Sequence, residues 1–183
     1  MAAVLDNSYS MSGSNEKKRR PLGVALAASY LLRAASQNYQ AFWTKAAPTE
    51  LFVQVHGQTP LGERLLDALA WQPDLVIIIS DGFENDPPLG AAEVARVYRR
   101  KLDPNYRTEI IHTNPVFDAE NYAPRLIGAA IPTVGLRDAE DLSTMLGFAR
   151  FASGALPLSE LEAYLAKRVE IMTTISKARV HTL

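Results

Sequence analysis

The sequence contains no cysteine, and this absence removes several kinds of chemistry at once. Disulfide bonds, thiolate zinc sites, iron–sulfur clusters and cysteine nucleophiles are all excluded. Because only three histidines occur among 183 residues, sites built from nitrogen ligands are also few. A metal site in this protein is therefore expected to use oxygen ligands, which suit hard cations.

The sequence also lacks long apolar runs and an excess of charge of one sign. No stretch of about 18 apolar residues is present, so no membrane span is predicted. The first residues show no basic region followed by an apolar one, so we expect no signal peptide and a cytoplasmic location. The 19 basic and 20 acidic residues argue against a strongly basic nucleic-acid-binding surface. With 48% hydrophobic residues, the chain can instead form an ordinary globular core.

Short apolar segments alternate with helical patterns along the chain. Strands are predicted over residues 2–5, 51–55, 75–79 and 109–111, with a weaker strand over 132–136. Helices are predicted over residues 21–36, 60–70, 91–101 and 139–149, and again from Ser159 onward. This alternation is typical of an α/β fold with a mainly parallel sheet and helices on both faces. A hairpin at residues 47–49, joining 41–44 to 50–55, would add one short antiparallel edge strand.

Polar side chains gather at the ends of three predicted strands. Asp6, Ser8 and Ser10 form a D-x-S-x-S sequence after the first strand. Thr59 follows the second strand and Asp81 follows the third. Because the carboxyl ends of parallel strands meet at one edge, we expect these side chains to lie close together. Their carboxylates and hydroxyls can hold Mg²⁺, or Mn²⁺ or Ca²⁺, and leave one position open for an acidic group of a protein partner.

Each part of this pattern also has an ordinary structural interpretation. Thr59 suits the N-cap of a helix, and Asp81 suits the start of a turn. Glu84 and Asp86 could extend the site into a hydrolytic two-metal centre, but the favoured interpretation is that they cap or solvate the loop. No phosphate-binding loop, dinucleotide-binding fingerprint or nucleophile elbow is present. We therefore expect no enzyme, and a metal-dependent hydrolase is the least favoured alternative.

The motif resembles the metal-ion-dependent adhesion site of von Willebrand factor A domains, which reads D-x-S-x-S, then a threonine, then an aspartate. Asp6, Ser8, Ser10, Thr59 and Asp81 match it in order. The resemblance implies a Rossmann-like A domain over residues 1–170, with residues 171–183 as a helical extension or tail. Because the first predicted strand begins at residue 2, we expect this domain to be cut from a longer protein. The resemblance also implies ligation by the three hydroxyls, direct or water-mediated ligation by the aspartates, and a protein-interaction function.

A narrower resemblance suggests a second function. Residues 97–104 and 141–148 are similar to the C-terminal A domain of Ro (TROVE) ribonucleoproteins. That family binds small RNAs mainly through a separate helical ring, which this sequence does not supply, so RNA binding is not carried over. The alternative function is a subunit of an RNA-associated assembly. Basic clusters at residues 16–20 and 96–101 would support it if they faced one side, although solvated helix charge is the favoured interpretation.

Overall fold

The computed structural model describes residues 1–13, 20–46, 52–116 and 123–152, and the isolated positions 157, 159, 162, 163, 166 and 167. Its centre is a five-stranded sheet of order β2-β1-β3-β4-β5, in which every neighbouring pair is parallel. The strands are β1 (Ala2–Leu5), β2 (Gln40–Trp43), β3 (Leu75–Ile79), β4 (Glu109–Asn114) and β5 (Thr133–Gly135). This mixed α/β architecture is compatible with the predicted Rossmann-like class.

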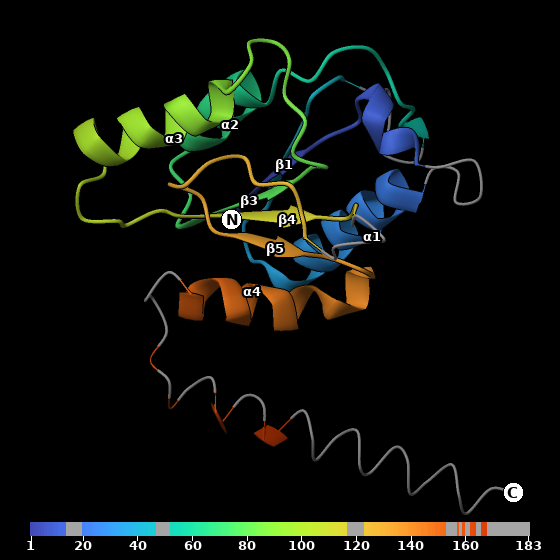
Figure 1. Cartoon of the computed structure of the whole chain (residues 1–183). Coiled ribbons are helices and arrows are strands. Elements are labelled where there is room, and N and C mark those ends of the chain that lie inside the picture. Colours follow the sequence, from blue (N-terminus) through green and yellow to red (C-terminus); the bar gives the residue numbers. More distant parts are fainter. Residues whose placement is uncertain are drawn as a thin grey trace, which may run out of the picture.

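Helices cover both faces of the sheet. The α-helices are α1 (Arg20–Ala35), α2 (Leu61–Ala70), α3 (Gly90–Lys101) and α4 (Leu142–Ala152), and the short 3₁₀ helices are η1 (Tyr9–Ser12) and η3 (Ala139–Asp141). Figure 1 shows α2 and α3 on one face and α1 and α4 on the other. Among the described residues, no helix combines the length and the apolar character needed to cross a bilayer.

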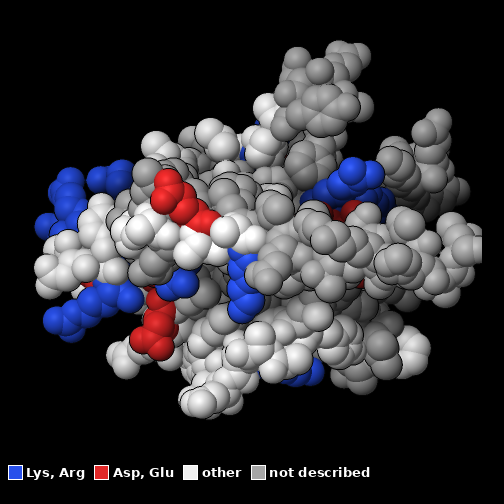
Figure 2. Space-filling model, turned by 90° about the horizontal axis from the view of Figure 1, so that it is seen from below, with Lys and Arg blue, Asp and Glu red and all other residues white. Residues whose placement is uncertain are grey.

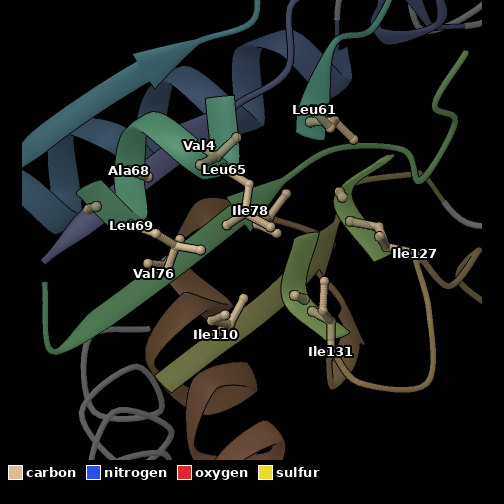
Figure 3. Packing of buried hydrophobic residues seen from close by; sticks show 13 residues of the cluster. Val4, Leu61, Leu65, Ala68, Leu69, Val76, Ile78, Ile110, Ile127 and Ile131 are labelled. Atoms are coloured by element: carbon tan, nitrogen blue, oxygen red, sulfur yellow. The ribbon is translucent and has the colours of Figure 1, made fainter. Parts of the chain in front are cut away.

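Successive side chains of a strand point to opposite sides of the sheet. Because helices cover both sides, the central strands are buried on both faces. In β3, Val76 and Ile78 enter the core formed with α2 and α3, whereas Ile77 and Ile79 enter the core formed with α1. Figure 3 shows Val76 and Ile78 packed beneath the apolar side of α2. The continuous apolar sequence of β3 is thus explained by two cores rather than one.

Small residues allow the start of α2 to approach the start of α3. A Cβ atom on Gly62 would lie only 2.9 Å from the carbonyl carbon of Gly90. Glu84 joins the same two helix starts, since its Oε1 accepts hydrogen bonds from the backbone N–H of Gly62 at 2.8 Å and of Ala91 at 2.9 Å. The interpretation of Glu84 as a capping residue is therefore confirmed.

The predicted hairpin and its antiparallel edge strand are not found among the described residues. The edge strand β2 runs parallel to β1, and residues 53–55 have no regular secondary structure. Val53 and Val55 still pack against the core, which explains the apolar character of this segment. However, the carbonyl oxygen of Gln54 accepts a hydrogen bond from the side chain of Asn7 at 3.1 Å rather than from a neighbouring strand. Residues 47–51 lie outside the described residues.

The other element predictions agree with the structure within a few residues. The weak strand at 132–136 is confirmed as β5, and the helical pattern at 139–149 divides into η3 and α4. β4 extends to Asn114, beyond the predicted end at residue 111. The helix predicted from Ser159 and the proposed tail at 171–183 lie largely or wholly outside the described residues.

Candidate metal centre

The first candidate ligand, Asp6, lies where β1 leaves the sheet. Its backbone N–H donates to the carbonyl of Ile79 at 3.0 Å, which continues the pairing with β3 by one residue. The side chain is fully buried. Its Oδ1 accepts a hydrogen bond from the backbone N–H of Ser8 at 2.8 Å, and its Oδ2 accepts one from the Ser80 hydroxyl at 2.9 Å. These contacts fix the carboxylate at the carboxyl edge of the sheet.

The two serine hydroxyls converge beside this carboxylate. The chain turns into η1 directly after Ser8, and this turn brings the Oγ atoms of Ser8 and Ser10 to 3.0 Å from each other. The Ser10 side chain also forms a hydrogen bond with the carboxylate of Asp81. Ser8 is buried and Ser10 is exposed, so the pair connects the interior of the site with its surface.

Asp81 follows β3 and Thr59 lies on an adjoining loop. Asp81 is 5% exposed, and its Oδ1 accepts a hydrogen bond from the backbone N–H of Phe83 at 2.9 Å. Thr59 is buried, and its backbone N–H donates to Oδ1 of Asn85 at 2.9 Å. Among the described residues, no hydrogen bond joins the Thr59 hydroxyl to the other four candidates. The structure thus links Asp6 to Ser8, Ser8 to Ser10 and Ser10 to Asp81 by hydrogen bonds. Thr59 is joined through Asn85 to the loop that follows Asp81.

Burial makes the ionised forms of both aspartates unfavourable. The loss of solvation raises the pKa of Asp6 to about 6, and the neighbouring charge of Asp81 adds to this rise. Burial also raises the pKa of Asp81, while its hydrogen bonds with Ser10 and Phe83 and the positive charge of Arg125 oppose the rise. A cation bound between the carboxylates would remove their repulsion and replace the lost solvation. The donor set therefore fits a hard divalent cation.

Asn7 holds the surrounding loops in place, a role that sequence reasoning missed. Its Oδ1 accepts hydrogen bonds from the Thr44 hydroxyl and the backbone N–H of Lys45, both at 2.8 Å. Its Nδ2 donates to the carbonyls of Lys45 at 3.2 Å and Gln54 at 3.1 Å. The side chain of Asn7 therefore points away from the candidate ligands and ties the segments after β2 to the motif.

Two further residues that the sequence did not single out support the site from β4. The ring of His112 is fully buried, with Nε2 at 2.9 Å from the carbonyl of Ser80 and Nδ1 at 3.1 Å from the Thr133 hydroxyl. Burial lowers the pKa of His112 to about 4, so the imidazole is neutral at pH 7. Asn114 donates from Nδ2 to the carbonyl of Asp81 at 3.0 Å. The longer strand β4 carries Asn114 to the same edge as the motif, and the strand-end rule could have identified it.

The site differs from metal centres built from charged and imidazole ligands alone. Among the described residues, no group of three or more His, Cys, Asp or Glu side chains is arranged to hold a metal ion. The candidate centre depends instead on two carboxylates combined with hydroxyl groups.

Comparisons with protein-family models, with curated proteins and with solved structures find no match. The likeness to von Willebrand factor A domains accordingly remains a resemblance carried by the motif and its order along the chain.

Several residues of the two basic clusters have acidic neighbours. On α3, Arg96 forms an ion pair with Glu93 at 2.6 Å, and Arg99 forms one with Asp103 at 2.7 Å. Figure 2 shows basic side chains gathered at one edge of the face seen from below, with acidic side chains beside them. Residues 16–19 of the first cluster lie outside the described residues. Charge on α3 is thus partly neutralised by the protein itself.

Proposed function

We propose that this chain is a divalent-cation-dependent protein-interaction module with an A-domain type of fold. Asp6, Ser8, Ser10, Thr59 and Asp81 would hold Mg²⁺ or a related cation, and an Asp or Glu of a protein partner would take the open position. The observation that carries the proposal is the contact of two buried carboxylates with two hydroxyls, whose Oγ atoms lie 3.0 Å apart, at the carboxyl edge of a parallel sheet.

The mixture of charged and neutral ligands explains why such a site would accept a further acid. Serine and threonine hydroxyls contribute oxygen atoms without adding negative charge. Mg²⁺ prefers six oxygen ligands and usually retains several waters. Because only two carboxylates belong to the site, the bound ion would not be over-neutralised, and a partner carboxylate could replace a water. The exposure of Ser10 provides an approach from solvent.

The surroundings favour binding over catalysis. His112 lies beneath Ser80, but its ring is fully enclosed and held in the neutral form, so it does not face an incoming substrate. Glu84 is engaged with the starts of α2 and α3 and does not add a carboxylate to the candidate centre. We therefore propose that the chain is not an enzyme.

Calorimetric titration with Mg²⁺ and Mn²⁺ tests the metal site. Wild-type protein is expected to bind one ion per chain. The variant Asp81→Asn is expected to lose affinity by at least the roughly 10–100-fold that is typical of substitutions around metal ligands. Asp74→Asn is the matched control, because Asp74 is an exposed aspartate at the opposite end of β3. An absence of binding by the wild type, or equal binding by wild type and Asp81→Asn, contradicts the proposal.

A further inference from the structure

An exposed arginine lies directly beside the candidate metal centre. Gly82 follows Asp81 with a φ of +78°, and a Cβ atom at this position would lie 2.9 Å from the carbonyl oxygen and 3.0 Å from Cγ of Arg125. The backbone and the side-chain stem of Arg125 thus occupy the space that the absent side chain of Gly82 leaves. The positive charge of Arg125 is close enough to lower the pKa of Asp81.

Two contacts hold Arg125 in this position. Asn114, which is fully buried, donates from the same Nδ2 atom to the carbonyls of Asp81 at 3.0 Å and Arg125 at 3.2 Å, and so joins their two loops. The guanidinium carbon of Arg125 lies 3.6 Å from the centre of the Phe83 ring, which is half exposed. Stacking on an aromatic ring restricts the guanidinium and leaves its edge N–H groups available to a ligand.

We propose that Arg125 binds a second carboxylate of the protein partner, so that the module recognises two acidic residues adjacent in sequence rather than one. This inference rests on the proposed function, in which the first carboxylate reaches the cation held by Asp6 and Asp81. Among the described residues, Arg125 forms no ion pair, and its side chain is exposed.

Arg125, stacked on Phe83, is suited to bind a carboxylate. Its position favours an acidic residue close to the one that would reach the cation. A guanidinium presents parallel N–H donors that match the two oxygens of a carboxylate. Because Arg125 packs on the residue that follows Asp81, the second acid must lie near the first in the partner. The stacked arginine loses little conformational freedom on binding, which increases the affinity gained from each hydrogen bond. Arg125 therefore acts as a specificity-determining residue.

Titration of the labelled protein, followed by ¹H–¹⁵N correlation spectra in saturating Mg²⁺, tests this inference. The probes are two capped glycine-rich hexapeptides, one with the central pair Asp-Asp and one with Asp-Asn. Wild-type protein is expected to bind the Asp-Asp peptide roughly two- to fivefold more tightly, the range of an exposed ion pair. Arg125→Gln is expected to abolish this preference, while Arg100→Gln, at the far end of α3, is expected to retain it.

The affinity for Mg²⁺ in the absence of peptide is a second readout. On this readout, a carboxylate-binding Arg125 and a merely structural Arg125 predict opposite effects of its substitution. Removal of a positive charge beside the centre is expected to tighten Mg²⁺ binding in Arg125→Gln, by roughly two- to fivefold. A structural loss would weaken both metal and peptide binding. Equal affinity of the wild type for the two peptides, or an unchanged preference in Arg125→Gln, overturns the inference while leaving the metal site intact. If Mg²⁺ binds and neither peptide does, the carboxylate-binding role is itself overturned, and if Mg²⁺ does not bind, the proposed function fails first.

Discussion

Replacement of Asp6 by asparagine is expected to stabilise the metal-free protein. Burial raises the pKa of Asp6 from 3.8 to about 6. One pKa unit corresponds to about 1.4 kcal/mol, so the ionised carboxylate destabilises the folded state by about 3 kcal/mol at pH 7.5. Asparagine has nearly the same shape without the charge. Its amide can still accept from the backbone of Ser8 and can donate to the hydroxyl oxygen of Ser80.

The sign of the effect with pH follows from the raised pKa. Between pH 3.8 and about 6 the folded protein binds more protons at Asp6 than the unfolded chain does, so its stability falls as the pH rises through this interval. Above pH 6 the unfavourable contribution is fully present. The advantage of Asp6→Asn should therefore be largest at pH 7.5 and should disappear near pH 4.

Thermal unfolding in EDTA and in Mg²⁺ provides the assay. In EDTA at pH 7.5, Asp6→Asn is expected to melt roughly 5–10 °C above the wild type, given the usual relation between stability and melting temperature for a chain of this length. Addition of Mg²⁺ at about 100 times its dissociation constant should stabilise the wild type by about 2.7 kcal/mol and leave the variant almost unchanged. The exposed Asp74→Asn should behave as the wild type in both buffers.

Two outcomes would refute this reasoning. If Asp6→Asn melts below the wild type in EDTA, the buried charge is not a source of instability. If Mg²⁺ stabilises the variant as much as the wild type, Asp6 does not belong to the metal site. The first result bears on the electrostatics of the fold, and the second bears on the proposed function.

Two further predictions concern the fold around the site. Gly62→Ala should lower the free energy of unfolding in urea by roughly 1–3 kcal/mol, because the added Cβ would lie 2.9 Å from the Gly90 backbone. The control Gly23→Ala in α1, where an added Cβ meets no atom within 4 Å, should raise the free energy of unfolding by up to about 1 kcal/mol. Equal effects of the two substitutions would show that the contact of α2 with α3 is loose. His112→Gln should make stability less sensitive to acid. Burial lowers the pKa of His112 to about 4, so the free energy of unfolding of the wild type falls by about 3 kcal/mol between pH 6.5 and pH 4. If the difference in stability between the two proteins does not vary over this interval, the ring is not buried in its neutral form.

The sequence predicted most of the α/β architecture because its strands and helices are encoded locally. The run at residues 75–79 is apolar at every position, as a strand between two helical layers requires, and it forms β3. The segment at 51–55 shows where this reasoning failed. Its apolar residues Val53 and Val55 pack against the core, but the hydrogen bond to the carbonyl of Gln54 is made by the side chain of Asn7 from a distant loop.

The candidate site was also predicted only in part from the sequence. The order of Asp6, Ser8, Ser10, Thr59 and Asp81 along the chain, together with the rule that parallel strand ends meet at one edge, predicted which residues to look for. In the structure, hydrogen bonds link Asp6, Ser8, Ser10 and Asp81 one to the next, and Thr59 is joined to the loop after Asp81 through Asn85. Metal binding by these residues remains a prediction.

By itself, the sequence determined the mixed α/β class of fold and predicted oxygen ligands for a metal site, because strand periodicity, strand-end motifs and the absence of cysteine are properties of the chain alone. Only the tertiary structure decided the contacts of Asn114 and Arg125 and the burial that raises the pKa of Asp6. Hydrogen bonds between distant loops and the removal of a carboxylate from water depend on which segments meet in space. A local pattern of residues does not predict these contacts between distant segments.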